Sequence, residues 1–124
     1  MSKVIIIGGG AAGMFAALGA VDAGHHVTIL EQNEKLGKKI YITGKGRCNL
    51  TNACDIDELF ASICTNSKFL YSAFYGFTNQ DTIQFFEKAG LRTKTERGNR
   101  VFPCSDHSSD VIGTLEKKNE RKRC

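Results

Sequence analysis

Three glycines near the N-terminus have the spacing of a phosphate-binding turn. Gly8, Gly10 and Gly13 form the motif G-x-G-x-x-G, with Ala11 and Ala12 before the last glycine. The first glycine allows a tight turn from strand to helix, the second leaves room for a pyrophosphate, and the third lets the helix pack closely on the strand. The N–H groups near the two alanines would donate to the phosphates at the positive end of the helix dipole. The motif predicts a dinucleotide-binding turn.

Glu31 is the second part of this pattern. Seventeen residues separate it from Gly13, and it follows a short β-branched segment. A carboxylate at the end of a second strand can accept hydrogen bonds from both hydroxyls of an adenosine ribose. The same charge repels a 2′-phosphate, so an NADP site is disfavoured here. FAD and NAD both remain compatible with this part of the sequence.

A cationic, glycine-rich segment follows Glu31. Such a segment can fold back over a cofactor and offer N–H donors and positive charge to a pyrophosphate. A plain NAD domain does not generally need a second phosphate-binding segment after the glycine turn, so this segment favours FAD. The alternative is a solvated, positively charged loop. The candidate cofactor-binding residues that it adds are Gln32, Lys38, Lys39, Gly44, Gly46, Arg47, Cys48 and Asn49.

The elements that would position these residues form a strand–helix–strand unit. The β-branched run at 3–7 predicts a strand buried on both faces of a parallel sheet. The alanine-rich segment 11–23 predicts a helix that ends at Gly24, and 26–30 predicts a second strand. The fold class is therefore α/β, with a Rossmann-like βαβ unit at the N-terminus.

The rest of the chain predicts added helices and a β-hairpin. A long loop is expected from Gln32 to Ala53, because no periodicity interrupts it. The expected elements after it are a helix capped by Asp55, helical structure at 69–77, a helix opening at Thr78, a hairpin at 91–102 turning at Gly98-Asn99, and a last helix capped by Ser108 or Ser109.

Composition and charge exclude several classes of protein. The chain has 124 residues, of which 41% are hydrophobic, which suits one folded domain. The net charge of +4 comes entirely from residues 117–124, so a nucleic-acid partner is not expected. The five cysteines contain no C-x-x-C pair, so no metal site is expected. No apolar run reaches the roughly 18 residues that a membrane-spanning helix needs, so no membrane partner is expected. We expect the protein to be located in the cytoplasm.

Three segments in this order resemble one family. They are the motif at residues 8–13, the string Gly-Lys-Gly-Arg-Cys-Asn-Leu-Thr-Asn at 44–52, and the string Arg-Gly-Asn-Arg-Val-Phe-Pro at 97–103. Together they resemble the N-terminal part of the BaiN/YhiN-type flavoproteins, which are NAD(P)/FAD-dependent oxidoreductases often grouped as aminoacetone-oxidase-like FAD-binding enzymes. The resemblance extends from Met1 to about Glu116.

The resemblance implies a glutathione-reductase-like FAD domain and hydride exchange at the flavin ring. FAD would be bound by residues 8–13, Glu31 and the loop from Lys38 to Asn49, and NAD(P)H would be the electron donor in the longer protein. Members of the family are several times longer. We therefore expect residues 1–116 to be a truncated, partial FAD/NAD(P)-binding domain and 117–124 to be a basic tail, either disordered or an aberrant end.

Two other interpretations remain open, an NAD-binding Rossmann domain and a catalytically silent fragment. The chain alone is expected to be inactive. The sequence identifies no catalytic residue, small-molecule substrate or oligomeric state.

Overall fold

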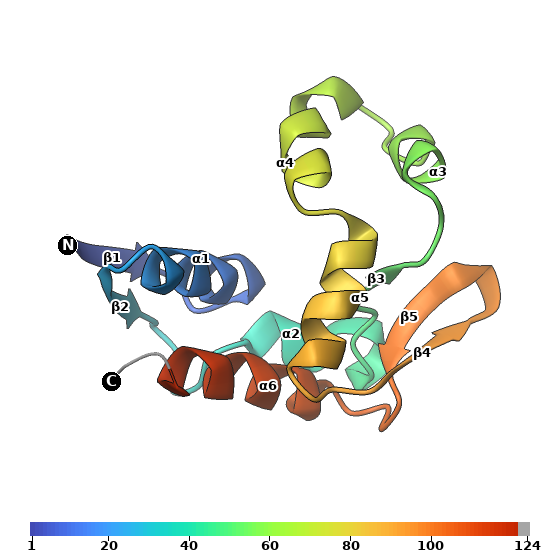
Figure 1. Ribbon diagram of the computed structural model, residues 1–124. Helices are drawn as coiled ribbons and strands as arrows, with labels where there is room; N and C mark the ends of the chain where they lie inside the picture. The colour runs from blue at the N-terminus through green and yellow to red at the C-terminus, as the bar shows by residue number, and fades with distance from the viewer. Residues whose placement is uncertain (122–124) are drawn as a thin grey trace. The chain divides into compact units, whose positions relative to one another are not determined.

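The computed structural model describes residues 1–121 and divides into two compact units (Figure 1). The Rossmann unit consists of Met1–Cys48 together with the chain from Asp106 onward. The inserted unit is Asn49–Ser105, which lies between these two segments in the sequence. Residues 122–124 of the expected basic tail lie outside the described residues.

Two parallel strands begin the Rossmann unit. β1 (Lys3–Ile7) and β2 (His26–Leu30) pair residue by residue along their whole length. Their β-branched side chains favour extended backbone. The ladder continues past β1, because the Gly8 N–H donates to the Leu30 carbonyl at 2.7 Å. Both predicted strands are confirmed, and both end at the same edge of the sheet.

α1 (Ala11–Asp22) connects the strands and packs on one face of their sheet. Met14, Ala17 and Leu18 are buried there. Gly24 takes φ +85° and donates to the Val21 carbonyl at 2.9 Å, which is the left-handed ending that glycine favours. The predicted strand–helix–strand unit is therefore confirmed.

The other face of the two strands is open. Exposure alternates along both strands, and Ile5 is 65%, Ile7 80% and Leu30 50% exposed. The prediction that both faces are buried is wrong for the described residues. A β-branched run favours a strand, but it does not specify how many layers cover that strand.

The segment predicted as one long loop contains short helices. α2 (Lys38–Ile42) is followed by a 3₁₀ turn, Thr43–Gly46. A helix of five residues is too short to show a 3.6-residue periodicity, so its presence could not be inferred from hydrophobic spacing. The prediction of an uninterrupted loop is wrong.

α6 (Ser108–Arg121) completes the Rossmann unit and packs against α1 and α2. Val111 and Leu115 are its buried residues. Ser108 is its first residue, and the hydroxyl donates to the Tyr41 carbonyl at 2.7 Å, which ties the start of α6 to α2. The helix continues through residues 117–121, which the sequence placed in a tail.

The inserted unit contains a small antiparallel sheet with strand order β3-β5-β4. Its strands are β3 (Thr51–Asn52), β4 (Thr93–Glu96) and β5 (Arg100–Pro103). β4 and β5 are the predicted hairpin. Its turn holds Gly98 at φ +75° and Asn99 at φ +60°, conformations that glycine and asparagine tolerate.

Between β3 and β4 in the sequence, the inserted unit is helical. The helices there are α3 (Ile56–Ala61), a 3₁₀ turn at Ser67–Leu70, α4 (Tyr71–Gly76) and α5 (Asn79–Lys88). Asp55 caps α3 by accepting from the Glu58 N–H, and Thr78 forms a reciprocal capping box with Asp81 at the start of α5. Both predicted helix starts are confirmed.

Candidate functional site

The turn from β1 into α1 requires glycine at two positions for reasons internal to the protein. Gly8 has φ +98°, a left-handed conformation that other residues disfavour. A Cβ atom on Gly13 would overlap the carbonyl oxygen of Gly8. Glycine at these positions therefore permits the tight turn and the close helix–strand packing that the motif predicts.

Gly10 is different, because nothing in the described protein requires glycine there. Its φ of −83° suits any residue, and a Cβ atom built on it meets no atom within 4 Å. Gly10 is also the N-cap residue of α1, so no side chain caps the helix, and the first turn has no acidic residue. Ala11 and Ala12 are exposed. Open space thus lies in front of N–H groups that have no partner within the helix, which suits a phosphate.

The carboxylate of Glu31 lies beside this turn and is held by N–H donors. Oε1 accepts from the Gly9 N–H at 2.9 Å, and Oε2 accepts from the Asn33 backbone N–H at 2.8 Å and from Asn33 Nδ2 at 3.0 Å. The backbone N–H of Asn33 and then that of Gly9 lower the pKa of Glu31, and together with weaker contributions from the Asn33 side chain and the Gln32 N–H they outweigh the opposing effect of desolvation. The side chain is therefore ionised at neutral pH and fixed at the end of β2.

The segment after Glu31 packs against the glycine turn. The Gly37 N–H donates to the Gly9 carbonyl at 2.8 Å, and a Cβ atom on Gly9 would overlap the side chain of Leu36. Gly37 has φ +74°, and a Cβ atom there would lie 2.9 Å from Cγ1 of Ile112 in α6. The glycine turn, residues 36–37 and α6 thus form one set of contacts.

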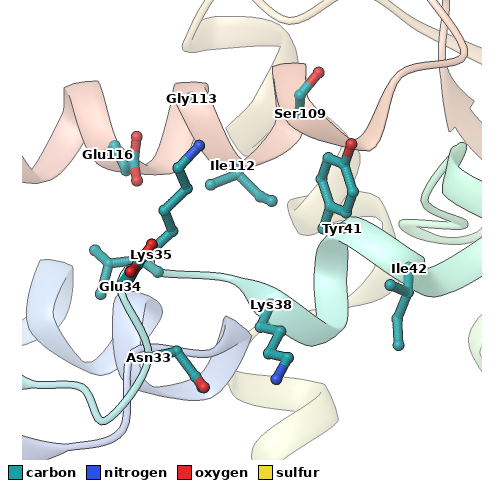
Figure 2. Close-up of a pocket in the computed structure, with 11 residues that line it drawn as sticks. Asn33, Glu34, Lys35, Lys38, Tyr41, Ile42, Ser109, Ile112, Gly113 and Glu116 are labelled. Atoms are coloured by element: carbon teal, nitrogen blue, oxygen red, sulfur yellow. The ribbon is translucent and has the colours of Figure 1, made fainter.

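A cavity of about 900 Å³ lies between this segment and α6. Figure 2 shows that Lys35 extends across it toward α6, whereas Asn33 and Lys38 point away from α6. The predicted cofactor residues Gln32, Lys38 and Lys39 are all exposed. Their side chains are therefore available to an anion, and their binding role stays a prediction.

The loop from Gly44 to Cys48 turns sharply. Gly44 and Gly46 both have positive φ, and so do Lys45 at +56° and Cys48 at +59°. Arg47 directs Nε and Nη2 to Oδ1 of Asp106, at 2.8 and 2.7 Å. Cys48 is buried, and burial raises the pKa of its thiol, partly offset by a hydrogen bond with the Thr43 side chain. Arg47 is therefore paired inside the Rossmann unit, and Cys48 is not poised as a thiolate.

Asn49 belongs to the inserted unit rather than to the unit that holds the glycine turn. In the amide orientation that satisfies both of its ends, its side-chain N donates to the Val101 carbonyl at 3.2 Å and to the Thr51 carbonyl at 2.9 Å. These bonds connect the start of the inserted unit to β5 and β3. A contact of Asn49 with a cofactor stays a prediction.

Three residues of the site were not singled out from the sequence. Asn33 could have been suspected, because asparagine readily bonds to nearby groups in turns. Leu36 gave no signal beyond being apolar. Asp106 is 59 residues from Arg47, and no local pattern connects them.

Metal-ligand clusters and membrane-spanning helices are both absent from the part of the chain that the structure describes. No three metal-ligating side chains of histidine, cysteine, aspartate or glutamate gather within it. None of its helices combines the length and the apolar character needed to cross a bilayer.

Comparison with known proteins agrees with this geometry. The family described as HI0933-like protein Rossmann domain matches residues 2–124. The crystal structure of THI4 from Thermovibrio ammonificans superposes with a TM-score of 0.61 at 13% identity, covering 97% of this chain and 35% of that one. At that identity, the likeness supports the α/β Rossmann-like fold alone.

Two curated relatives are similar in sequence. A 3-dehydro-bile acid delta(4,6)-reductase of Clostridium scindens is 40% identical, covering 99% of this chain and 30% of the relative. A ribosomal RNA dihydrouridine synthase of Escherichia coli is 36% identical, covering 94% of this chain and 28% of the relative. The chain thus spans less than a third of either relative.

Proposed function

Because the chain belongs to the HI0933-like protein Rossmann domain family, a family of flavoprotein oxidoreductases, we propose that it binds FAD through the ADP half of that cofactor. In this proposal the chain is the cofactor-binding part of an oxidoreductase that transfers hydride by way of FAD. When bound, the flavin ring supplies the redox chemistry, and the protein supplies binding and orientation.

The observation that carries the proposal is the open space at Gly10. Gly8 and Gly13 are explained by the packing of the protein itself, whereas Gly10 is not. A glycine that the fold does not need, placed before an uncapped helix of twelve residues, suits the close approach of a pyrophosphate.

The neighbouring residues fit the remainder of an ADP group. The N–H groups at Ala11 and Ala12 would donate to the phosphates, and Glu31 would accept from the ribose. The exposed ammonium groups of Lys38 and Lys39 would add positive charge. The ionised Glu31 would also repel a 2′-phosphate, so NADP is disfavoured at this site.

For the longer protein we propose a class of reaction, hydride transfer by way of FAD, and no particular substrate. The printed names of the two relatives refer to different substrates, so we name no substrate for this chain. We propose NAD(P)H as the electron donor and the cytoplasm as the location. The four cysteines that the structure describes are free thiols, which supports a reducing compartment.

A competition experiment tests the proposal. FAD is titrated into the purified chain while flavin fluorescence is followed, and then ADP, NADH or NADP is added. We expect FAD to bind, ADP to displace it, and NADP to compete least. Binding of NADH without FAD would support an NAD domain instead. No binding of either FAD or ADP would overturn the proposal.

A further inference from the structure

The carboxylate of Glu31 has little capacity left for a ribose. A carboxylate has two oxygens, each with two acceptor positions. Both positions of Oε2 are used by Asn33, through its backbone N–H at 2.8 Å and Nδ2 at 3.0 Å. One position of Oε1 is used by the Gly9 N–H at 2.9 Å. These three hydrogen bonds leave one acceptor position, on Oε1, and the backbone N–H of Gln32, which also lowers the pKa of Glu31, competes for the same carboxylate.

A ribose presents two neighbouring hydroxyl groups. If Glu31 accepts from one of them, the second needs another partner, because an unpaired polar group at a binding site costs affinity. Among the described residues, the polar side chain that donates a hydrogen bond to Glu31 is the carboxamide of Asn33.

The carboxamide of Asn33 has the required acceptor. Its Nδ2 is committed to Glu31, and Oδ1 lies at the other end of the same planar group. Oδ1 accepts no hydrogen bond from the described part of the chain. Figure 2 shows the side chain pointing away from α6, as Lys38 does. The hydrogen bond to Glu31 thus fixes a carboxamide whose oxygen is available.

We propose that Asn33 shares the recognition of the ribose with Glu31. Glu31 accepts one hydroxyl at Oε1, and Asn33 accepts the other at Oδ1. This inference rests on the proposed function, since it concerns the same ADP-binding site. It makes Asn33 a direct determinant of specificity for an unmodified ribose.

The test combines changes in the protein with changes in the ligand. Affinities for ADP, 2′-deoxy-ADP and 3′-deoxy-ADP are measured by calorimetry on the unmutated chain and on Asn33→Ala. We expect Asn33→Ala to weaken ADP binding about three- to tenfold, the effect of one hydrogen bond. We expect this loss to vanish for one of the deoxy ligands and to persist for the other.

Two further variants complete the design. Asn33→Gln keeps both an accepting oxygen and an N–H donor for Glu31 and adds no charge beside that carboxylate, so the affinity lost on removing that same hydroxyl from the ligand should remain, as in the unmutated chain. Asn119→Ala is the matched control, because Asn119 is also a half-buried asparagine of the Rossmann unit, with Nδ2 bonded to the Leu115 carbonyl at 3.0 Å. It should leave all three affinities unchanged.

The outcomes separate this inference from the proposed function. If the unmutated chain binds no ADP, the proposed function fails and this inference fails with it. If the chain binds ADP but Asn33→Ala loses the same factor for all three ligands, Asn33 acts only by positioning Glu31 and the shared recognition is wrong. An unchanged affinity in Asn33→Ala would also overturn it.

Discussion

A side chain on Gly13 would overlap the carbonyl oxygen of Gly8. The contact joins the first turn of α1 to the end of β1, so relieving it would require the helix to move away from the strand. We therefore expect Gly13→Ala to lower the free energy of unfolding by about 1–3 kcal/mol, the usual cost of overpacking. Urea titration followed by circular dichroism measures this. An unchanged unfolding midpoint would show that α1 can shift without cost.

Gly10→Ala should weaken nucleotide binding and leave the stability of the chain nearly unchanged. The added methyl group meets no protein atom within 4 Å, so we expect the free energy of unfolding to change by less than about 1 kcal/mol, the scale of an N-cap effect. ADP and FAD should bind roughly tenfold more weakly, because the methyl group occupies the space proposed for the pyrophosphate. Calorimetry on the folded variant checks this, with Gly19→Ala as the control, since Gly19 lies in the same helix and also has open space around it. Equal affinities of Gly10→Ala and the unmutated chain would contradict the binding mode.

Glu31 should make the free energy of unfolding of the chain depend on pH in the acidic range. Its pKa is lowered in the folded chain from an ordinary value of 4.5, so its stabilising contribution is present above that value and is lost as pH falls through the lowered pKa. We expect Glu31→Gln to be less stable than the unmutated chain at pH 7, and the difference to shrink below pH 4.5. Urea titrations across this range measure it.

Glu87 provides the control for this prediction. It lies in the inserted unit, and hydrogen bonds from Thr93 lower its pKa as well. Glu87→Gln should therefore show the same direction of acid dependence while leaving ADP affinity unchanged. Glu31→Gln, by contrast, should weaken ADP binding, because Glu31 is proposed to accept from the ribose. Equal losses of ADP affinity in both variants would instead reflect general destabilisation.

The ion pair of Arg47 and Asp106 should contribute modestly to stability. Their side chains are 33% and 41% exposed, so solvent screens much of the attraction. We expect a double-mutant cycle with Arg47→Met and Asp106→Asn to give a coupling of about 0.5–1 kcal/mol. Asparagine is chosen because residue 106 has φ +60°, which asparagine tolerates. A coupling that did not decrease in 1 M salt would contradict the screened pair.

The parts of the fold that the sequence predicted depend on neighbours in the chain. The strands, α1 and its ending at Gly24 follow from β-branched runs and single-glycine signals. The hairpin turn at Gly98-Asn99 and the caps at Asp55 and Thr78 follow from turn and cap chemistry. Each of these signals acts over a few residues.

The parts that could not be predicted depend on distant contacts. The pairing of Arg47 with Asp106 joins residues that are far apart in the sequence, and it uses a cation that the glycine-rich pattern had assigned to a cofactor. The division of the chain after Cys48 separates Asn49 from its neighbours in the same motif. The motif marked a set of residues, but tertiary packing decides which unit each one serves.

The ion pair between Arg47 and Asp106 lies where the long insertion leaves and re-enters the Rossmann unit. Since the chain leaves this unit and re-enters it at residues in direct contact, the intervening segment closes a loop whose entropic cost changes by only about 0.6 kcal/mol for each doubling of its length. Changes in the length of that segment therefore impose little entropic cost on the Rossmann unit. The glycine turn and Glu31 lie outside this segment, so the proposed nucleotide site tolerates such changes.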